Sequence, residues 1–322
     1  MRFHIFSLAL TALLLKKYTD YEKNQLVTEN YTIAAEGLKK PCRILFLSDL
    51  HEKSFGTKAG EDRLFASIRA AKPELILLGG DLIVSGKRRP FPFSLLQPAD
   101  KSDLVDRTCA FLKRLQIEYP VYMALGNHET RLRLKAERGN RAAAAKWQKL
   151  RRAMEGITLL DRETALLPEW GISITGVTLP MLCYHKLLFR KKHFLSEKCF
   201  RRCGGAFPQE KSFRICLLHT PLYYREAIDY GADLVLSGHY HGGTIRLPGL
   251  GGLMTPQFQF FVKECAGLHR YGRGQVLVNR GLGTHSVNLR LNDRPELSLI
   301  TLLPGEGGAQ ESNKDKPVLK EE

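Results

Sequence analysis

Five short apolar runs, each followed within a few residues by Asp, Asn or His, limit the possible folds of this chain more than any other feature. They read RILFLSDLH, ELILLGGDL, VYMALGNHE, RICLLHTP and DLVLSGHYH and occupy residues 43–51, 74–82, 121–129, 214–221 and 233–241. Unbroken apolar runs of this length are typical of strands that are covered on both faces. Helical patterns lie between them, at 61–71, 103–115, 141–154 and 221–230. The sequence therefore predicts an α/β fold in which helices cover two sheets.

The two ends of the chain and its last third have a different character. We expect a polar connector at 18–40, and a disordered polar tail at 304–322 because that segment has little to bury. Short strands separated by Gly, Asn, Asp and Pro are typical of an antiparallel sheet. They are expected at 244–247, 275–279, 287–291 and 297–302.

Side chains that can bind metal ions follow the five apolar runs. They are Asp49, His51, Asp81, Asn127, His128, His219, His239 and His241. Ligands of open α/β sheets bind beyond the carboxyl ends of the strands, so these side chains are expected to converge. Imidazole nitrogen with carboxylate and amide oxygen suits manganese, iron or zinc better than magnesium or calcium. Eight groups are too many for one tetrahedral ion and fit two ions that share a carboxylate, a pair that can activate a phosphoryl group.

Each motif alone also has an ordinary structural interpretation. An Asp at a strand end often caps a helix, and Gly-Asp often forms a turn. A lone His219 would more often be a hydrogen-bonded core histidine. The metal interpretation depends on all five motifs occurring in order, each after an apolar run.

In this order the motifs resemble the calcineurin-like metallophosphoesterases. The blocks that carry the resemblance are Asp49-Leu50-His51, Gly80-Asp81, Gly126-Asn127-His128-Glu129, His219 and Gly238-His239-Tyr240-His241. The resemblance implies a four-layer α/β/β/α sandwich over residues 41–303, with a dinuclear metal centre at the strand ends. It implies one ion on Asp49, His51 and His241, another on Asn127, His219 and His239, and a bridging Asp81. Manganese is the expected metal, with iron or zinc as alternatives.

The resemblance also implies that His128 faces the substrate and protonates the leaving oxygen. Elementary chemistry supports this role. A carboxylate between two dications is held ionised, so Asp81 is a poor acid. An imidazole just outside the ligand set can donate a proton near neutral pH.

Two later stretches indicate a branch of the family. GHYHGGTIRLPGLGGLMTP at 238–256 and YGRGQVLVNRGLGTH at 271–285, with the apolar N-terminus, resemble the membrane-associated bacterial metallophosphoesterases. That branch includes UDP-2,3-diacylglucosamine pyrophosphatases of lipid A synthesis. The residues after Asp81 lack the Asp-Arg-Gly of protein serine/threonine phosphatases, which argues against a phosphoprotein substrate.

Three functions remain open at this point. The leading hypothesis is hydrolysis of a phosphodiester or pyrophosphate bond in a lipid-linked nucleotide such as UDP-2,3-diacylglucosamine. A nuclease or nucleotide phosphodiesterase could use the same metals. A non-catalytic membrane-binding scaffold would be marked by the loss of ligands, and none of the family's ligands is missing.

The N-terminus carries a membrane signal. Residues 3–15 read FHIFSLALTALLL, and Lys16-Lys17 follow. This stretch is shorter than the roughly 20 residues of a comfortable membrane span. We expect residues 1–17 to form a short anchor or interfacial helix, and the alternative is a buried helix. The paired lysines favour the cytoplasmic face.

The charge balance favours anionic partners. The chain has 49 Lys and Arg against 33 Asp and Glu, a net charge of +16. Basic and apolar residues mix at 131–152, at Lys87-Arg88-Arg89 and in an expected insertion at 181–203 that includes Phe189 and Phe194. The apolar residues of this insertion are expected to form one patch that binds the bilayer or the apolar part of the substrate; they are Leu187, Leu188, Phe189, Phe194, Leu195 and Phe200. The ordinary interpretation of each is a solvated helix face. Together they favour an anionic membrane surface, where each nearby Lys or Arg adds on the order of 1 kcal/mol, over nucleic acid.

Overall fold

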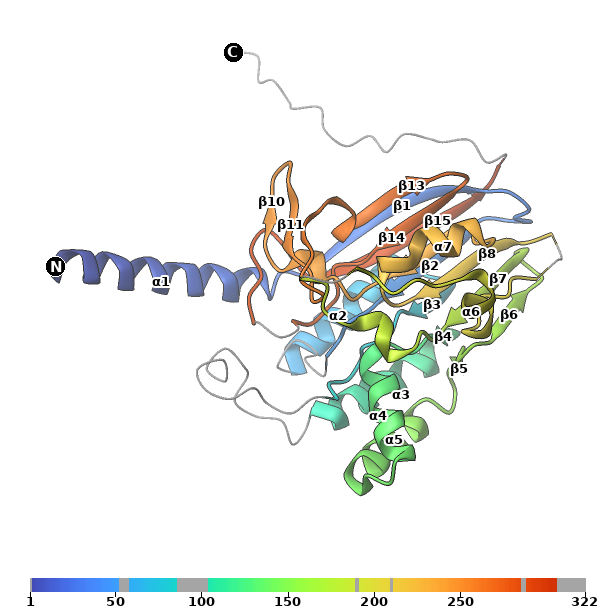
Figure 1. Ribbon diagram of the computed structural model, residues 1–322, viewed down its shortest axis with the longest axis horizontal. Helices are drawn as coiled ribbons and strands as arrows, with labels where there is room; N and C mark the ends of the chain where they lie inside the picture. The colour runs from blue at the N-terminus through green and yellow to red at the C-terminus, as the bar shows by residue number, and fades with distance from the viewer. Residues whose placement is uncertain are drawn as a thin grey trace, which may run out of the picture.

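The computed structural model describes residues 2–51, 58–85, 104–188, 191–208, 211–284 and 288–305. Within these ranges two six-stranded sheets stack face to face, and helices cover the outer face of each (Figure 1). The first sheet has the order β1 (Val27–Ala35), β15 (Glu296–Pro304), β2 (Cys42–Leu47), β3 (Leu75–Leu78), β4 (Val121–Met123) and β5 (Thr158–Leu159). The second has the order β13 (Gly267–Tyr271), β14 (Gly274–Val278), β9 (Leu234–Ser237), β8 (Phe213–Leu218), β7 (Ile172–Val177) and β6 (Thr164–Leu167).

Both sheets are mixed. Strands β2 to β5 run parallel in the first sheet, and β7, β8, β9 and β14 run parallel in the second. Antiparallel pairing occurs where β15 meets β2, β6 meets β7 and β13 meets β14. A small antiparallel sheet stands apart, formed by β10 (Arg246–Leu247), β11 (Gly251–Met254) and β12 (Phe260–Val262). The predicted four-layer α/β/β/α sandwich is confirmed.

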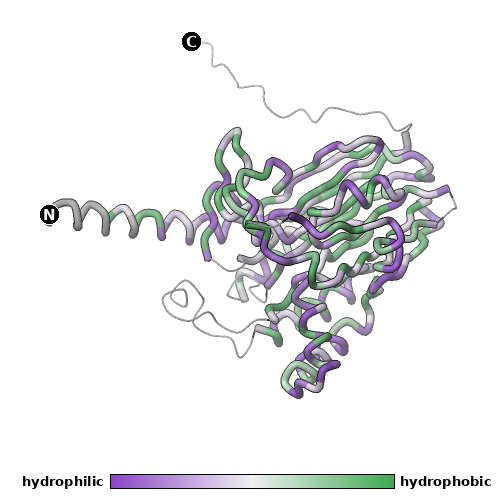
Figure 2. Tube along the Cα trace, in the orientation of Figure 1, coloured by the Kyte–Doolittle hydropathy of each residue, from purple (hydrophilic) through white to green (hydrophobic). Residues whose placement is uncertain are grey.

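The buried runs alternate between two cores. In β2, Ile44 and Phe46 face the other sheet, whereas Leu45 and Leu47 face the helices. The same alternation holds along β3, β8 and β9. Figure 2 shows the result as apolar strands inside and polar helices outside. Apart from Arg43 in β2 and Arg214 in β8, every position of these strands is buried, so the sequence has no alternating polar residues there.

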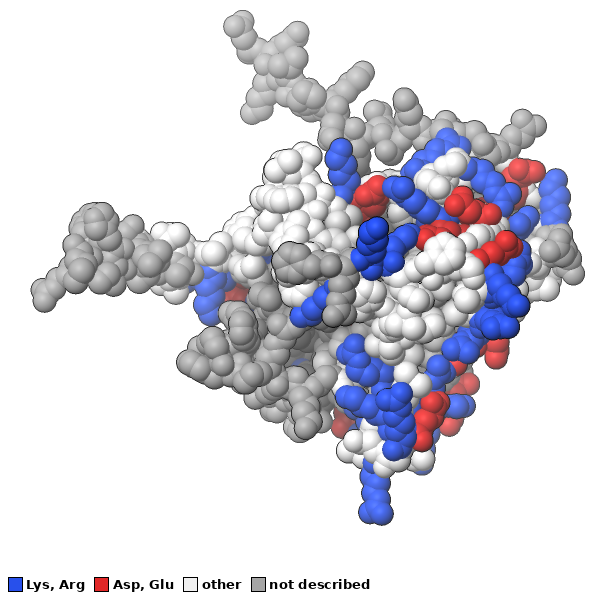
Figure 3. All heavy atoms as spheres, viewed as in Figure 1, with Lys and Arg blue, Asp and Glu red and all other residues white. Residues whose placement is uncertain are grey.

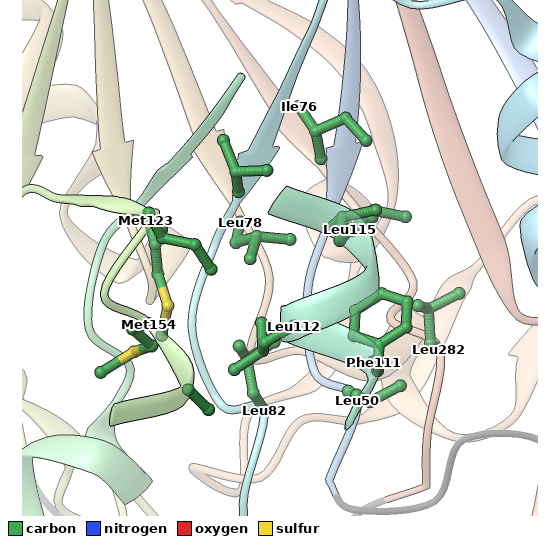
Figure 4. Packing of buried hydrophobic residues seen from close by; sticks show 14 of the residues in the cluster. Leu50, Ile76, Leu78, Leu82, Phe111, Leu112, Leu115, Met123, Met154 and Leu282 are labelled. Atoms are coloured by element: carbon green, nitrogen blue, oxygen red, sulfur yellow. The ribbon is translucent and has the colours of Figure 1, made fainter. Parts of the chain in front are cut away.

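Two sets of helices cover the sheets. The first sheet packs against α2 (Lys58–Ala71), α3 (Leu104–Glu118), α4 (Asn127–Glu137) and α5 (Arg141–Ala153). Figure 4 shows part of this core, with Phe111, Leu112 and Leu115 of α3 against Ile76 and Leu78 of β3. The second sheet packs against α6 (Glu197–Arg202) and α7 (Tyr224–Asp229).

Most of the predicted elements are present, and the differences have local causes. The predicted helix at 221–230 is a 3-10 turn followed by α7. Helix α4 was not predicted because it begins at Asn127, inside a motif that was interpreted for its chemistry. The predicted strand at 287–291 is not formed by its described part, where Leu291 makes only an isolated bridge to Ile245. The tail lies outside the described residues from 306 onward.

The expected connector at 18–40 contains β1, the edge strand of the first sheet, in parallel register with β15. Its residues alternate in exposure along most of their length, so the strand lacks the continuous apolar run of the central strands. Edge strands have one open side, and polar residues are common there.

The N-terminal helix α1 (Arg2–Glu22) extends from the domain (Figure 1). Its last turn is held by Glu22, a buried carboxylate that accepts hydrogen bonds from Asp293 N (3.2 Å) and Arg294 Nε (3.0 Å). Leu13, Leu14 and Leu15 are exposed. Among the described residues, no helix combines the length and the apolar character needed to cross a bilayer.

Candidate metal centre

The loops after β2, β3 and β9 turn sharply at the residues that were predicted to bind metal. Five of these residues adopt φ between 48° and 65°, a left-handed conformation that costs an L-residue roughly 1–2 kcal/mol. They are Asp49, His51, Asp81, His239 and His241. Strain of this kind persists only where the surrounding structure imposes it, and it is typical of functional sites.

One group of side chains consists of Asp49, His51 and His241, all buried. Asp49 Oδ1 lies 3.2 Å from His241 Nε2 and 3.6 Å from His51 Nε2. The two Nε2 atoms are 3.0 Å apart and their rings are stacked. Two imidazole nitrogens and a carboxylate oxygen that point at one another are a donor set for a cation.

A second group consists of Asp81, His219 and His239, also buried. Asp81 Oδ2 lies 3.1 Å from His219 Nε2. Asp81 also belongs to a third set with His51 and His128, and within each set the potential ligand atoms lie within 4.8 Å of one another. Asp81 therefore stands between the group around His51 and the group around His219.

Several atoms in these groups have no hydrogen-bond partner in the part of the chain that the structure describes. They are Asp49 Oδ1, Asp81 Oδ2, Asn127 Oδ1, His219 Nε2 and both ring nitrogens of His239. Leaving one buried polar atom unsatisfied costs about 1–3 kcal/mol. A cluster of such atoms, all of them oxygen or nitrogen donors, fits divalent cations.

Backbone contacts fix which oxygen of each aspartate is left over. Asp49 Oδ2 accepts from His239 N (2.9 Å), and Asp81 Oδ1 accepts from His128 N (2.8 Å). Oδ1 of Asp49 and Oδ2 of Asp81 therefore face the two groups. A Cβ on Gly238 would overlap the Asp49 carboxylate, and one on Gly126 would overlap that of Asp81. This close approach explains why glycine precedes both histidine motifs.

Carbonyl groups orient the imidazole rings. His219 Nδ1 lies 2.7 Å from Gly79 O, and His241 Nδ1 lies 3.3 Å from Gly283 O. A ring that donates from Nδ1 presents Nε2 as a lone pair, the arrangement that metal-binding histidines use.

Glu129 and Arg290 support the site without belonging to the clusters, and no role was predicted for either. The buried Glu129 carboxylate accepts from the N–H groups of Gly126, Asp81, Leu82 and Ile83, which ties two loops together. Burial, with the nearby Asp81 charge, raises the pKa of Glu129 to about 7. The sequence signal for this function is the third position after the Gly126 cap, where a Glu side chain reaches back to the helix start.

Arg290 is buried and donates to the carbonyls of Arg280, Gly281 and Gly283. Gly283 O is the carbonyl that orients His241, so Arg290 fixes one wall of the first group. Nothing local in the sequence distinguishes this arginine from the many exposed ones.

His128 lies at the edge of the clusters. Its Nδ1 accepts from Ser85 N (2.8 Å), and its Nε2 lies 3.9 Å from Asp81 Oδ2. Burial lowers the pKa of His128 to about 3. The free ring is therefore neutral, and the Ser85 bond places its proton on Nε2. Lys135 and Lys146 hold the supporting segment through the carbonyls of Ser85 and Val84.

Of the predicted substrate-contact residues, the structure describes only Phe194. Lys87, Arg88, Arg89 and Phe189 lie outside the described residues. Phe194 is 80% exposed, as a surface contact requires. The prediction of one apolar patch over 181–203 needs correction, because Leu195 and Phe200, the buried residue of α6, belong to the core between the second sheet and its helices.

The basic segment 131–152 forms α4 and α5, where Lys and Arg side chains crowd the surface (Figure 3). Some of this charge is neutralised locally. Arg133 pairs with Asp161 and Lys149 pairs with Asp106.

Comparisons with known proteins agree with this geometry. The family model described as calcineurin-like phosphoesterase matches residues 42–243, more than half of the chain. The phosphodiesterase YaeI of Escherichia coli is 28% identical over 82% of this chain and 83% of its own length. The metallophosphoesterase YkuE of Bacillus subtilis is 26% identical over 81% and 78%, and a metallophosphoesterase of Aquifex aeolicus is 26% identical over 90% and 97%.

Proposed function

Because the chain belongs to the calcineurin-like phosphoesterase family and is a metal-dependent phosphoesterase, we propose that it cleaves a phosphodiester or pyrophosphate bond in a lipid-linked nucleotide. UDP-2,3-diacylglucosamine is the leading substrate. The observation that carries the proposal is that a segment with exposed apolar side chains contacts the clusters through Tyr184. Tyr184 contacts two histidines of the second group, and Leu182, Leu188 and Phe194 are exposed nearby in the same segment.

The family uses a dinuclear centre of divalent ions, and we assign its ligands here. Asp49, His51 and His241 would hold one ion. His219 and His239, with Asn127 Oδ1, would hold the other, and Asp81 would be shared between the two. When bound, two such ions polarise a phosphoryl oxygen and lower the pKa of the attacking water. The mixed nitrogen and oxygen donors favour manganese, with iron or zinc as alternatives.

His128 is assigned as the group that donates to the leaving oxygen. Its Nε2–H is fixed by the Ser85 contact on the opposite nitrogen. Full proton transfer requires the doubly protonated ring, and a bound phosphoryl anion favours that form because opposite charge stabilises it. Ser85 Oγ lies 3.2 Å from Nδ1 and can then accept the second ring hydrogen.

Membrane association is proposed through α1. Its exposed leucines would enter the interfacial region of an anionic bilayer on the cytoplasmic side, with Lys16 and Lys17 near the headgroups. Glu22 contacts the 293–294 segment, close to Arg290 and the first group, so the helix joins the domain near the metal centre. A substrate with lipid chains would meet the clusters from this side.

The alternative is a nuclease or nucleotide phosphodiesterase, which the basic surface over α4 and α5 also suits (Figure 3).

Purified full-length protein with added manganese should be assayed on UDP-2,3-diacylglucosamine in detergent, bis-p-nitrophenyl phosphate, p-nitrophenyl phosphate and single-stranded DNA. Release of UMP with a kcat/KM well above that for the chromogenic diester supports the proposal. Faster cleavage of DNA supports the nuclease. If the protein binds both ions but turns over none of these substrates, the non-catalytic scaffold is supported.

A further inference from the structure

Tyr184 lies beside the second group of potential ligands. It is the last residue of a short 3-10 turn, η2 (Met181–Tyr184), which follows β7 and lies in contact with α4. The Tyr184 ring is 5.3 Å from the His239 ring in a T-shaped contact and 6.1 Å from the His219 ring. His128 contacts the ring of His51 in the first group instead. The two side chains therefore flank different halves of the site.

The hydroxyl of Tyr184 makes no hydrogen bond to the described part of the protein, and its side chain is only half-buried. The hydroxyl is therefore accessible to water or to a ligand, unlike the buried donor atoms of the two metal-binding groups. By contrast, the Tyr223 hydroxyl in the same core donates to His193 O (3.0 Å). A phenol has an ordinary pKa of about 10, so the hydroxyl can act as a donor near neutral pH.

A buried amide locks the backbone on both sides of Tyr184. Gln257 Nε2 donates to Cys183 O (3.0 Å) and to His185 O (3.2 Å). Gln257 Oε1 accepts from Thr220 Oγ1 (3.1 Å), directly after His219. Gln257 O accepts from Leu187 N (2.7 Å). One side chain thus ties the turn to a metal-ligand loop that is distant in the sequence.

A tyrosine with only a packing role would not need Gln257 to fix the backbone on both sides of it. The ring alone could pack against the histidines, and phenylalanine would serve equally well. An accessible hydroxyl beside a cluster of cation ligands can donate to a phosphoryl oxygen of the substrate. Hydrogen bonds from neutral donors to charged oxygens are stronger than those between neutral groups.

We propose that Tyr184 is a substrate-binding residue, whose hydroxyl donates to a phosphoryl oxygen held beside His219 and His239, and that Gln257 is the residue that positions it. The inference rests on the proposed phosphoesterase function. It deepens that function by naming the residue that contacts the phosphoryl group on the side away from His128. It applies to diesters and pyrophosphates alike, because both present an anionic oxygen there.

The test compares Tyr184→Phe with wild type and with Tyr223→Phe as the matched control. With bis-p-nitrophenyl phosphate and manganese, Tyr184→Phe should lower kcat/KM about tenfold, the value of one good hydrogen bond to a charged group. Inorganic phosphate should bind the manganese-loaded variant about tenfold more weakly by calorimetry. Metal content should stay at the wild-type level. Tyr223→Phe should lower Tm and leave phosphate binding unchanged.

Gln257→Glu tests the positioning role, because a carboxylate cannot donate to the two carbonyls. It should weaken phosphate binding, and adding Tyr184→Phe should then cost little more, as expected for residues that act through one another. Independent, additive losses would contradict the coupling.

The inference fails if Tyr184→Phe binds phosphate and turns over the diester as wild type does. It also fails if the metal content or the Tm of the variant falls in proportion to its activity, because Tyr184 would then have a structural role. Failure of the proposed function looks different, because the wild type itself would then bind two ions and hydrolyse no phosphoester.

Discussion

The metal-site loops and the neighbouring segment 181–203 are built in opposite ways. In the loops, buried polar atoms are fixed by backbone groups of other loops, as when His128 N donates to one oxygen of Asp81. In the segment, Leu182, Leu188 and Phe194 are exposed, and the position of Tyr184 depends on Gln257, more than 70 residues away. The potential metal ligands are thus buried and held on several sides, whereas several apolar side chains of the segment are exposed. The two regions should respond differently to mutation.

The largest expected effect falls on the loops. Asp81→Ala should lower turnover by at least about 10³-fold, or ~4 kcal/mol of transition-state stabilisation, since it removes a ligand from both groups. It should also lower metal content more than any other single ligand change, measured by elemental analysis. Asp62→Ala, an exposed carboxylate on α2, is the control. Two full equivalents of metal in Asp81→Ala would show that Asp81 does not bridge.

A smaller loss is expected where only the geometry of a loop is disturbed. The added methyl of Gly238→Ala would overlap the Asp49 carboxylate and the Ser48 hydroxyl, so Asp49 must move. Supporting contacts of metal ligands typically contribute 10- to 100-fold, and we expect a loss of about 10²-fold in activity. Gly272→Ala is the control, because open space surrounds it and only its φ of 53° is strained. Gly238 has no positive φ, so similar losses in both variants would mean that the overlap with Asp49 is not what limits activity.

How well the sequence predicts each region follows from the same contrast. The ligands could be predicted because each follows a buried strand whose carboxyl end meets the others at one sheet edge. Glu129 was visible in its motif, but its function was not, since its partners are the N–H groups of another loop. Arg290 and Gln257 were missed altogether, because a buried Arg or Gln looks like a surface residue until the chain is folded.

The segment 181–203 shows the limit of an apolar pattern. Leu195 and Phe200 looked like members of one surface patch with Phe194, yet they belong to the core between the second sheet and its helices. Leu195 and Phe200 follow Phe194 by one and six residues. Neither a helical nor a strand period separates these buried side chains from the exposed one. Strand β1 was missed for the opposite reason, since its half-exposed residues resemble a polar connector.

This division within the segment makes a testable contrast. Phe200→Ala should lower the free energy of unfolding by about 3–5 kcal/mol, the usual cost of emptying a buried phenylalanine site. Phe194→Ser should leave it unchanged, measured by urea unfolding. For a lipid substrate Phe194→Ser should raise KM by roughly tenfold, since burial of a Phe contributes about 1.5–3 kcal/mol. It should not affect bis-p-nitrophenyl phosphate. Equal effects on both substrates would place Phe194 in the catalytic machinery and not in lipid binding.

The smallest effect on chemistry is expected from the N-terminus. Removing residues 1–17 deletes the exposed leucines of α1 but keeps Thr19 and Glu22, which hold the base of the helix. Turnover of the small diester should therefore be unchanged, because no atom of the metal-binding groups is touched. Recovery with anionic vesicles in a flotation assay should fall, since the apolar surface that enters the bilayer is gone. Glu22→Gln in the full chain is a useful companion, because it weakens the contact to Arg294 and leaves the leucines in place. If the truncated protein is recovered only as inactive aggregate, α1 is a buried element of the fold, and membrane attachment must be sought elsewhere.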